Sequence, residues 1–599
     1  MTDVPDLFTL IGAGGRQVLA DAARTIEVPA GRTLFSEGDV ARSLFFIRNG
    51  ALGVFVRDAT PTDSPDDVPP LLIYVCRAGE TVGEMGVISG APRSASVIAI
   101  RDTELWVLSR TRFNALLKSH PQLMATVMRL LTHRLHRLTR EDRQVVEPCT
   151  IALVPTTSEI DIATLGQVAR RLRASITACG ARAHVIAKQS NAHTPEWFAA
   201  REKRHDVILL VSDPETPEWH DVCARQADRI LFVSDKATAH PDAIAPSLRN
   251  MQRGAHQLCD LVVLHRKDGD ASPGSDFAPP SNISEVCSSL GARRLFHLRE
   301  RIDSDWARLA RILCGRANGL VLSGGAARGF AHIGVLRAME EAGIPVDFVG
   351  GTSMGAIVAA CVALEMPADE IAERVREIFV RNNPMTDYVV PFVGLLRGAK
   401  ADRLLREKFG AVKIEDMWRP FYAVSSNLTK GGPHIHRDGP LTEALRASTS
   451  LPGIFPPVPT PDGLLVDGAA TSNLPVATMR ALHRGRIIAV DVARDLAITP
   501  QALAAESEGP WRSRLRRPPI LSILMRAATI SSEETDRREA RLADLLITPP
   551  LGDIELRDWQ AFDRAVDAGY RHACKVLASE SETFSGRIAT PAIPGTAAE

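Results

Sequence analysis

Apolar and polar residues alternate in different ways along the chain, and each way predicts a different kind of domain. From residue 8 to residue 110, short apolar runs are separated by turn residues, a pattern typical of β-strands. Asn49-Gly50 there supplies the positive φ of a tight hairpin turn. Beyond residue 150, apolar runs alternate with helical stretches, as in a buried parallel sheet. These runs cover residues 151–154, 183–186, 207–211, 230–233 and 261–264, and a second alternating region begins near residue 318.

The stretches between these regions predict the domain boundaries. A helical pattern built on Leu123, Val127 and Leu131 closes the first region, and residues 267–284 are rich in Gly, Pro, Ser and Asp. We therefore expect a multidomain protein. Its parts are a β-roll domain with a C-terminal helix over 8–145, an α/β spacer domain over 148–266, a linker and helical lead-in over 267–317, a second α/β domain over 318–480, and the continuation of that domain with a tail over 481–599.

Composition narrows the class of partner. The 599 residues include 45% hydrophobic and 24% charged residues, as expected of a globular protein with several domains. The formal net charge is zero, so no nucleic-acid partner is expected. Nine cysteines are scattered without a Cys-x-x-Cys pair, and no His, Cys or carboxylate cluster has metal-ligand spacing. We therefore expect reduced thiols and no metal site.

The sequence predicts a cytoplasmic protein. Residues 1–8 contain two aspartates and no basic stretch before an apolar core, so no signal peptide is expected. The longest apolar run, residues 355–364, is about half as long as a membrane span. Any membrane contact is therefore expected to be peripheral, at the inner face. Residues 511–517 combine a tryptophan with four arginines and could dock on anionic lipid, although a solvated loop is the slightly favoured interpretation.

A candidate nucleophile stands at Ser353. Gly351-Thr352-Ser353-Met354-Gly355 fits Gly-x-Ser-x-Gly, between a strand-like run at 346–350 and a helix of small residues at 354–364. Such a turn strains the serine backbone, so the flanking Gly351 and Gly355 must lack side chains. The turn also places the serine at a helix N-terminus, where the N–H of Met354 can stabilise an oxyanion.

A glycine-rich loop precedes this turn. Residues 323–329 read Ser-Gly-Gly-Ala-Ala-Arg-Gly, between a strand-like run at 319–322 and a helix at 330–341. Consecutive glycines let several N–H groups point into one cavity, which suits an oxyanion or a phosphate. A dinucleotide-binding loop is the alternative, but Ala326 occupies the middle glycine position of Gly-x-Gly-x-x-Gly.

A third motif follows a strand-like run at 464–466, where Asp467 is followed by Gly468 and Ala469. Together with the glycine-rich loop and the serine turn, it resembles the patatin-like phospholipases in order and context. Residues 330–336, 447–457 and 473–476 are also similar to that family. The resemblance covers residues 318–480 and departs from the family at Ala326, where glycine is usual and a methyl group would narrow the loop.

The resemblance implies a patatin-like α/β hydrolase domain with a Ser–Asp dyad. Ser353 would be the nucleophile and Asp467 the base of a serine acyl hydrolase that releases fatty acids from phospholipids or lysophospholipids without a catalytic cofactor. The implied oxyanion hole comprises Gly324, Gly325, Ala326, Arg328, Gly329 and Met354. An aspartate with its ordinary pKa of about 3.9 is a weak base, so either burial raises that pKa or catalysis depends heavily on the oxyanion hole. A full triad with His483 is the alternative.

A second resemblance lies at residues 82–97, which are similar to the phosphate-binding cassette of cyclic-nucleotide-binding domains. Arg93 would hold the cyclic phosphate through charge-assisted hydrogen bonds, and Glu84 would accept a bond from the ribose hydroxyl. The candidate nucleotide site comprises Gly83, Glu84, Met85, Gly86, Arg93 and Ser94. Cyclic AMP is the expected regulatory ligand, although Ser94 does not decide between adenine and guanine. A domain that keeps the fold and has lost the ligand is the alternative.

The order of these domains resembles the neuropathy target esterase group, whose members are lysophospholipases or phospholipases B. This chain looks like a compact bacterial relative. Residues 148–266 lack Gly-x-x-x-x-Gly-Lys-[Ser/Thr], so we interpret them as a structural spacer. The expected function is a lipid hydrolase regulated by a cyclic nucleotide. The alternative is a cyclic-nucleotide sensor with an inactive hydrolase domain.

Overall fold

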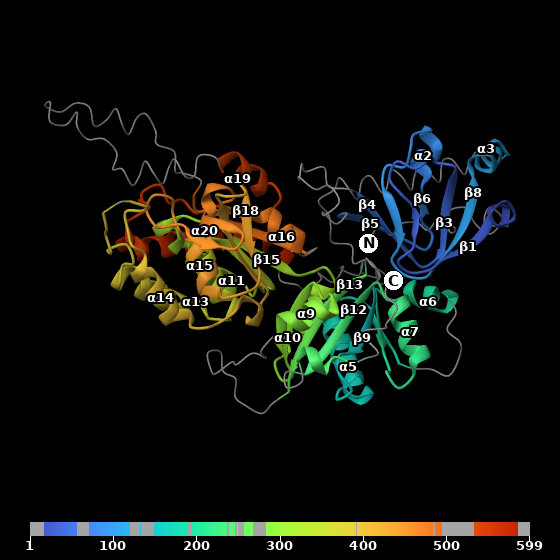
Figure 1. Cartoon of the computed structure of the whole chain (residues 1–599), viewed down its shortest axis with the longest axis horizontal. Coiled ribbons are helices and arrows are strands. Elements are labelled where there is room, and N and C mark those ends of the chain that lie inside the picture. The colour runs from blue at the N-terminus through green and yellow to red at the C-terminus, as the bar shows by residue number, and fades with distance from the viewer. Residues whose placement is uncertain are drawn as a thin grey trace, which may run out of the picture. The chain divides into compact units, whose positions relative to one another are not determined.

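The computed structural model describes most of the chain, which is coloured in Figure 1. The described residues are 17–56, 71–119, 128, 132, 149–187, 195–235, 239–245, 248, 257–266, 283–390, 392–482, 485–493 and 532–584. The chain forms two compact units, Met1–Leu264 with Glu285–Arg294 and His265–Ser284 with Leu295–Glu599. We call them the first unit and the second unit.

The first unit begins with a β-roll made of two four-stranded antiparallel sheets. One sheet has the order β1 (Arg24–Val28), β8 (Thr103–Ser109), β3 (Ser43–Asn49), β6 (Thr81–Val82), and the other β2 (Thr33–Phe35), β7 (Ser96–Ala99), β4 (Ala51–Val56), β5 (Leu71–Arg77). Alternate apolar side chains from both sheets, among them Phe45, Leu52 and Val97, form the core between them. Helices α2 (Glu84–Ser89) and α3 (Arg110–Ser119) also belong to the described part of this domain, as do the helical residues 17–22.

The predicted hairpin at Asn49-Gly50 is wrong, because β3 and β4 lie in different sheets. Gly50 has the expected positive φ, 99°, but it turns a corner between the sheets. The Asn49 amide donates to Glu104 at 2.8 Å, and a Cβ at Gly50 would lie 2.4 Å from the Thr103 hydroxyl. Both strands are buried along almost their whole length, so their apolar pattern could not indicate their partners.

The middle domain is a six-stranded sheet of order β10, β11, β9, β12, β13, β14. The apolar runs of the sequence become β9 (Cys149–Pro155), β10 (Ala183–Ile186), β11 (Val207–Val211), β12 (Arg229–Asp235) and β13 (Leu258–His265), which pair in parallel. Helices α5 (Ile162–Ala178), α6 (Pro195–Glu202) and α7 (Pro217–Gln226) connect them. The sixth strand, β14 (Arg294–Arg299), falls within the segment 267–317 that the sequence assigned to the linker.

The second unit contains a sheet of order β19, β20, β17, β16, β15, β21, β22, with β18 paired to β17. Its parallel centre is β15 (Asn318–Leu322), β16 (Phe348–Thr352), β17 (Phe421–Asn427), β21 (Arg486–Val490) and β22 (Leu545–Ile547). The strands β18 (Pro433–His436), β19 (Val458–Thr460) and β20 (Gly463–Asp467) join antiparallel at one side. The carboxyl ends of β15 and β16 therefore lie side by side, where the glycine-rich loop and the serine turn begin.

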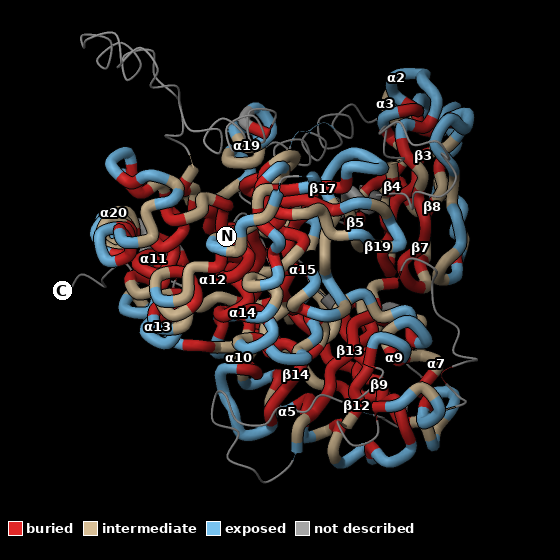
Figure 2. The backbone as a smooth tube through the Cα atoms, turned by 60° about the vertical axis from the view of Figure 1, so that its left-hand side comes forward, coloured by how far each residue is buried: buried red, intermediate tan, exposed pale blue. Residues whose placement is uncertain are grey.

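Helices cover this sheet and bury its centre. All residues of α12 (Met354–Ala363) are buried, and the tube at α12 is red in Figure 2. Helices α11 (Ala331–Glu341) and α20 (Phe562–Phe584) pack so closely that a Cβ at Gly334 would lie 1.9 Å from the carbonyl oxygen of Val566. None of the described helices is both long enough and apolar enough to cross a membrane.

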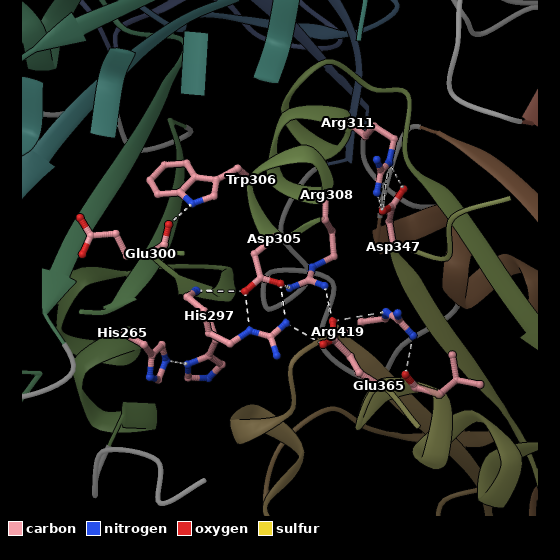
Figure 3. A network of polar contacts seen from close by, with 12 residues as sticks. His265, His297, Glu300, Asp305, Trp306, Arg308, Arg311, Asp347, Glu365 and Arg419 are labelled. Atoms are coloured by element: carbon pink, nitrogen blue, oxygen red, sulfur yellow. Dashed lines mark hydrogen bonds and ion pairs between the residues drawn. The ribbon is translucent and has the colours of Figure 1, made fainter. Parts of the chain in front are cut away.

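Buried charges hold the end of α12 in place (Figure 3). Arg308 donates to Asp305 on α10 (Asp303–Leu313) at 2.8 Å and to Glu365 at 2.7 Å. Arg299 contacts the same two carboxylates at 2.7 and 2.6 Å. Burial would raise the pKa of both carboxyl groups, but the arginines lower it below its ordinary value. Glu365 ends the turn that follows α12 with a positive φ of 62°.

The same helix α10 also holds the start of β16. Arg311 on α10 contacts Asp347 at 2.6 Å (Figure 3). Asp347 also accepts the backbone N–H of Asn318 at 2.9 Å. Helix α10 therefore fixes both ends of the strand–turn–helix that carries Ser353, at Asp347 before the strand and at Glu365 after the helix.

Candidate active site

Ser353 stands at a sharp turn between β16 and α12. Its backbone has φ 55° and ψ −123°, which is strained for a residue with a side chain. A Cβ at Gly351 would lie 2.4 Å, and one at Gly355 2.3 Å, from the carbonyl oxygen of Leu322 on β15. Both positions therefore require glycine, because the neighbouring strand passes directly beside the turn.

Asp467 faces Ser353 across the end of the sheet. It ends β20, which pairs with β17 so that Asp467 lies opposite Ser425. The Ser353 hydroxyl donates to Asp467 Oδ2 at 2.6 Å, and the N–H of Ala469 donates to Oδ1 at 2.9 Å. A Cβ at Gly468 would lie 2.4 Å from the carbonyl oxygen of Val424, so the turn after Asp467 also requires a residue without a side chain.

The environment of Asp467 changes its acidity. The side chain is fully buried, and burial raises its pKa to about 7, against the opposing effect of the hydrogen bonds from Ser353 and Ala469. A carboxylate with a pKa near neutrality can accept a proton from a serine much better than an ordinary aspartate. Within the described residues no histidine bonds to Ser353 or Asp467, and His483 lies outside them.

The glycine-rich loop lies against the nucleophile. A Cβ at Gly324 would be 3.2 Å from the Ser353 Cβ, and the N–H of Gly324 donates to the carbonyl of Asn473 at 3.2 Å. In the part of the chain that the structure describes, the N–H groups of Gly325 and Ala326 have no hydrogen-bond acceptor. Ala326 adopts φ 47°, a left-handed conformation that favours glycine. Gly325 and Ala326 are therefore the members of this loop whose donors remain available.

The other predicted oxyanion residues support the loop. Arg328 is buried; its Nε donates to the carbonyl of Ile554 at 2.7 Å and its backbone N–H to Gly325 at 3.0 Å. A Cβ at Gly329 would lie 2.3 Å from the Met354 side chain. Met354 begins α12, so its N–H lies at the helix N-terminus beside Ser353.

Sequence reasoning missed the part that Ser448 takes in this site. The Ser353 N–H donates to the Ser448 hydroxyl at 2.9 Å, and that hydroxyl donates to the carbonyl of Val424 at 2.6 Å. Ser448 ends α15 (Leu441–Ser448) and is completely buried. The backbone N–H of the nucleophile is thus already bonded and unavailable to an oxyanion. The only sequence signal was the place of Ser448 in a segment similar to the patatin family.

Asn473 and Asp536 form a second missed contact, behind the glycine-rich loop. The Asn473 amide donates to the carbonyl of Gly324 at 3.3 Å. Asp536, on α19 (Glu533–Ala540), accepts the N–H groups of Asn473 and Leu474 at 2.9 and 3.1 Å. Burial raises the pKa of Asp536 to about 7. The Asp536 carboxyl thus fixes the segment against which the loop rests.

A cavity of about 380 Å³ lies beyond the glycine-rich loop. Ser353 and Asp467 are not among its lining residues, which are Asn383, Met385, Tyr388, Leu395, Leu396, Ile454, Glu555, Arg557, Asp558 and Trp559. Leu396 and Ile454 are also core members of an apolar cluster against which Ala326 packs. The cavity and the loop are therefore separated by one shared apolar wall.

The predicted nucleotide site forms around Arg93 in the β-roll. Its guanidinium donates to the carbonyls of Gly83 and Ser43, both at 2.7 Å, and stacks on the Phe35 ring at 4.1 Å. Burial lowers the pKa of Arg93, against the opposing charge of Glu84, which is buried at the start of α2. The structure thus brings Gly83, Glu84 and Arg93 together.

The remaining predicted nucleotide residues lie around this core. A Cβ at Gly86 would lie 2.6 Å from the Cβ of Ala41, so helix α2 passes close to the segment between β2 and β3. The side chains of Met85 and Ser94 are exposed. Their contact with a nucleotide stays a prediction.

A buried charge cluster joins the β-roll to the middle domain within the first unit. Arg101, which follows β7 and is 2% exposed, donates to Glu202 at 2.7 Å and lies 3.6 Å from Asp228. Arg77, at the end of β5, donates to Asp228 at 2.9 Å. Asp228 also accepts the N–H of Thr150 on β9, at 3.0 Å. Arg101, two residues after the end of β7, therefore contacts the middle domain.

Comparison with known proteins assigns a family to each domain. Residues 320–480 match the family described as patatin-like phospholipase, and residues 25–120 match the cyclic nucleotide-binding domain. Residues 148–277 match the Neuropathy Target Esterase family P-loop like domain. These ranges fall on the sheet that carries Ser353, on the β-roll and on the middle domain.

One relative of similar length decides the family of the whole chain. An uncharacterized NTE family protein of Mycobacterium tuberculosis is 31% identical over 587 residues, and the alignment covers 94% of each protein. The chain belongs to the neuropathy target esterase (NTE) family. It is also 29% identical to lysophospholipase nte1 of Neosartorya fischeri and 28% identical to patatin-like phospholipase domain-containing protein 6 of Homo sapiens. Those alignments cover 92% of this chain, but 41% and 44% of the two relatives.

These findings confirm the predicted family and fold class of this NTE-family chain. It is a multidomain ester hydrolase with a cyclic nucleotide-binding β-roll, a middle α/β domain and a patatin domain. The segment at residues 511–517, for which membrane docking was considered, lies outside the described residues.

Proposed function

We propose that this NTE-family chain hydrolyses the acyl ester bond of lysophospholipids or phospholipids through a dyad of Ser353 and Asp467. The observation that carries the proposal is the 2.6 Å contact between the Ser353 hydroxyl and the fully buried Asp467 carboxylate. A buried base with a pKa near 7 and an accessible hydroxyl on a strained turn are what a nucleophilic ester hydrolase needs at neutral pH.

In the first step, Ser353 Oγ attacks the ester carbonyl carbon and its proton moves to Asp467 Oδ2. The tetrahedral intermediate collapses as Asp467 returns the proton to the leaving alkoxide, so a glycerophosphoryl alcohol departs and an acyl-enzyme remains. Asp467 then takes a proton from water, whose oxygen attacks the acyl carbon. Breakdown of this second intermediate returns the proton to Ser353 and releases the fatty acid.

The developing charge on the carbonyl oxygen needs fixed donors. The N–H groups of Gly325, Ala326 and Met354 are the proposed donors, because the N–H of Ser353 is bonded to Ser448 and that of Gly324 to Asn473. Ala326 can serve with its methyl group in place because its backbone already adopts φ 47°. Arg328 acts in this proposal as a support for the loop, through its bond to the carbonyl of Ile554.

A lipid substrate fits the apolar surroundings of the loop. The lining of the cavity beside it combines the apolar Met385, Leu395, Leu396 and Ile454 with the charged Glu555, Arg557 and Asp558. An acyl chain would lie on the apolar residues, with the polar head near the charged ones. The name of the fungal relative, lysophospholipase nte1, agrees with this substrate class.

The deciding experiment is covalent labelling of the full chain with a fluorophosphonate, followed by peptide mapping. We expect labelling on Ser353 and loss of both labelling and lysophospholipid hydrolysis in Ser353→Ala, whose fold should persist because only one oxygen is removed. Ser119→Ala, at an exposed serine, is the matched control. Labelling that survives in Ser353→Ala would place the nucleophile elsewhere, and absence of labelling in the wild type would favour the inactive-hydrolase alternative.

We further propose that the β-roll binds a cyclic nucleotide, cyclic AMP being the first ligand to test, and thereby regulates hydrolysis. The observation that favours this is the convergence of Arg93, Glu84 and Gly83 in the predicted cassette. A cyclic phosphate would exchange places with the carbonyls that Arg93 now contacts. Calorimetry on the full chain should show weaker binding by about 1.5–3 kcal/mol in Arg93→Ala, the value of a hydrogen bond to a charged group. Equal binding by the variant would contradict the assignment.

A further inference from the structure

A small hairpin stands out in the second unit between the short π-helix η3 (Glu377–Arg381) and α14 (Ala399–Phe409). Its arms are joined by a bridge between Tyr388 and Leu396, by a bond from Val389 N–H to the Leu395 carbonyl at 3.1 Å, and by one from Arg397 N–H to the Asp387 carbonyl at 2.9 Å. At the far end, the N–H of Phe392 donates to the carbonyl of Val390 at 2.9 Å. These hydrogen bonds join the described residues of the two arms and connect Val390 with Phe392.

The far end of this hairpin is apolar and exposed. Val390 is 72% exposed, Phe392 92% and Val393 67%, and Tyr388 beside them is 70% exposed. We call Val390, Phe392 and Val393 the apolar tip. Other exposed large apolar residues of the described second unit, such as Leu428 at 57% and Leu542 at 43%, lie elsewhere in the chain. A cluster of exposed apolar side chains on one turn marks a surface that another apolar phase covers.

The base of the hairpin is anchored beside the proposed active site. The N–H groups of Leu395 and Leu396 donate to the carbonyls of Gly453 and Ile454, at 3.1 and 2.9 Å. Leu396 is buried in the apolar cluster against which Ala326 of the oxyanion loop packs. The hairpin residues Tyr388, Leu395 and Leu396 also line the 380 Å³ cavity. The hairpin therefore runs from the catalytic loop, along the cavity, to the apolar tip.

We propose that the apolar tip inserts into the surface of a lipid bilayer and holds the cavity mouth against the membrane from which substrate is drawn. This inference rests on the proposed function, because only a lipid substrate requires the cavity to meet a bilayer. Two features favour a bilayer over a second protein. An aromatic and two β-branched aliphatic residues on a narrow turn suit the interfacial region of a membrane. The exposed Arg397 and the Lys400 ammonium, which donates to Thr386, lie at the hairpin base, where anionic head groups would be.

The test measures membrane binding separately from catalysis. Full-length Ser353→Ala protein is floated with vesicles of phosphatidylcholine and phosphatidylglycerol, with and without the added pair Phe392→Ser and Val393→Ser. We expect the pair to weaken vesicle binding about tenfold or more, as removal of buried apolar side chains requires. In a protein that keeps Ser353, the double substitution should leave the rate of hydrolysis of a soluble short-chain ester within about twofold of the wild-type rate. Leu428→Ser is the matched control and should bind vesicles like the parent protein.

A second readout keeps the test independent of small losses of stability. Phe392→Trp should show a blue shift of its added fluorescence on mixing with vesicles, and quenching by brominated lipid, whereas Leu428→Trp should show neither. Equal vesicle binding with and without the double substitution Phe392→Ser and Val393→Ser would overturn the proposal. So would a double variant that no longer self-associates in light scattering but binds vesicles as before. Failure of the dyad would instead appear as soluble-ester hydrolysis that survives Ser353→Ala, a result that vesicle flotation does not influence.

Discussion

The backbone N–H of Ser353 donates a hydrogen bond to the buried Ser448 hydroxyl, 2.9 Å away, and Ser448 in turn donates to the carbonyl of Val424 on β17. The strained turn of the nucleophile is thereby attached to the neighbouring strand by one side chain. The same bond removes the Ser353 N–H from the donors that could stabilise an oxyanion. Ser448 is thus a positioning residue for the proposed reaction.

Ser448→Ala should therefore lower kcat of lysophospholipid hydrolysis about tenfold or more, with KM little changed. The physical reason is that the strained φ of 55° at Ser353 loses one of the bonds that hold it, a net loss of about 0.5–1.5 kcal/mol plus the cost of an unpaired N–H. Steady-state kinetics on the full chain gives both constants. Ser448→Thr, which keeps the hydroxyl, should recover part of the lost rate. An unchanged kcat in Ser448→Ala would show that the turn needs no such support.

The pH dependence should follow Asp467. Its folded pKa, about 7, lies above the ordinary value near 3.8, so the group is protonated and unable to accept a proton below neutrality. We expect kcat/KM to rise with pH through about 7 and then to level off. The sign for stability is opposite: the folded chain holds this proton where the unfolded chain has lost it, so the contribution to stability falls as pH rises from about 4 to about 7.

Asp536 has a pKa raised to about the same value and serves as the control for this profile. Asp536→Asn should change the height of the pH–rate curve but keep its midpoint, because Asp536 contacts Asn473 and Leu474 rather than Ser353. If the midpoint of the pH–rate curve moved in Asp536→Asn but not with substitutions around Asp467, the titrating group would be Asp536, and the prediction for Asp467 would be wrong.

The charge cluster at the end of α12 should matter for stability more than for chemistry. Glu365→Gln leaves Arg299 and Arg308 facing a neutral group, and breaking a buried pair costs about 3–5 kcal/mol of unfolding free energy. Because the pKa of Glu365 is lowered in the fold, the wild type should lose this contribution as pH falls below the ordinary carboxylate range. Urea unfolding at several pH values measures both effects. Asp462→Asn, at an exposed ion pair with Lys430, is the control and should leave the midpoint unchanged.

Nucleotide regulation should pass through the Arg101 cluster. Arg101 follows β7, which begins three residues after Arg93, and contacts Glu202 and Asp228 of the middle domain. Glu202→Gln should leave cyclic-nucleotide affinity within about threefold while reducing the change in hydrolysis rate that the nucleotide causes, since coupling requires contacts that differ between two states. Calorimetry and titrated hydrolysis rates separate the two. A variant with an undiminished rate response would direct the search to another route, such as the helix predicted from the apolar pattern at Leu123, Val127 and Leu131, whose residues fall mainly outside the described ones.

The sequence located elements well where a single pattern determines them. Runs such as 207–211 are apolar throughout because parallel strands are buried on both faces, and β11 covers the same residues. The sequence pattern failed to predict strand pairing where the partner strands are distant in the chain. The strands on either side of Asn49-Gly50 are buried almost throughout, so nothing in their pattern showed that they lie in different sheets.

The residues of the candidate site also fall into those that the sequence could predict and those that it could not. Ser353 and Asp467 belong to short motifs, which the family resemblance linked before the structure placed their oxygens 2.6 Å apart. Ser448 reaches Ser353 across 95 residues through one hydroxyl, and a serine in a helix has no local mark of such a contact. The exposure of Phe392 could not be read from sequence either, because an apolar residue in a loop is more often buried than exposed.

The most direct test of the dyad is the turnover number of Asp467→Asn in lysophospholipid hydrolysis at pH 8, measured on the full chain beside the wild type. Asparagine fills the same space and can still accept the N–H of Ala469, so the fold should persist. It cannot take the proton of Ser353, and loss of a general base lowers rates by about 10²–10⁴-fold. We expect a loss in this range, with His483→Ala close to the wild-type rate. An Asp467→Asn protein that turns over within about tenfold of the wild type would contradict the Ser353–Asp467 dyad.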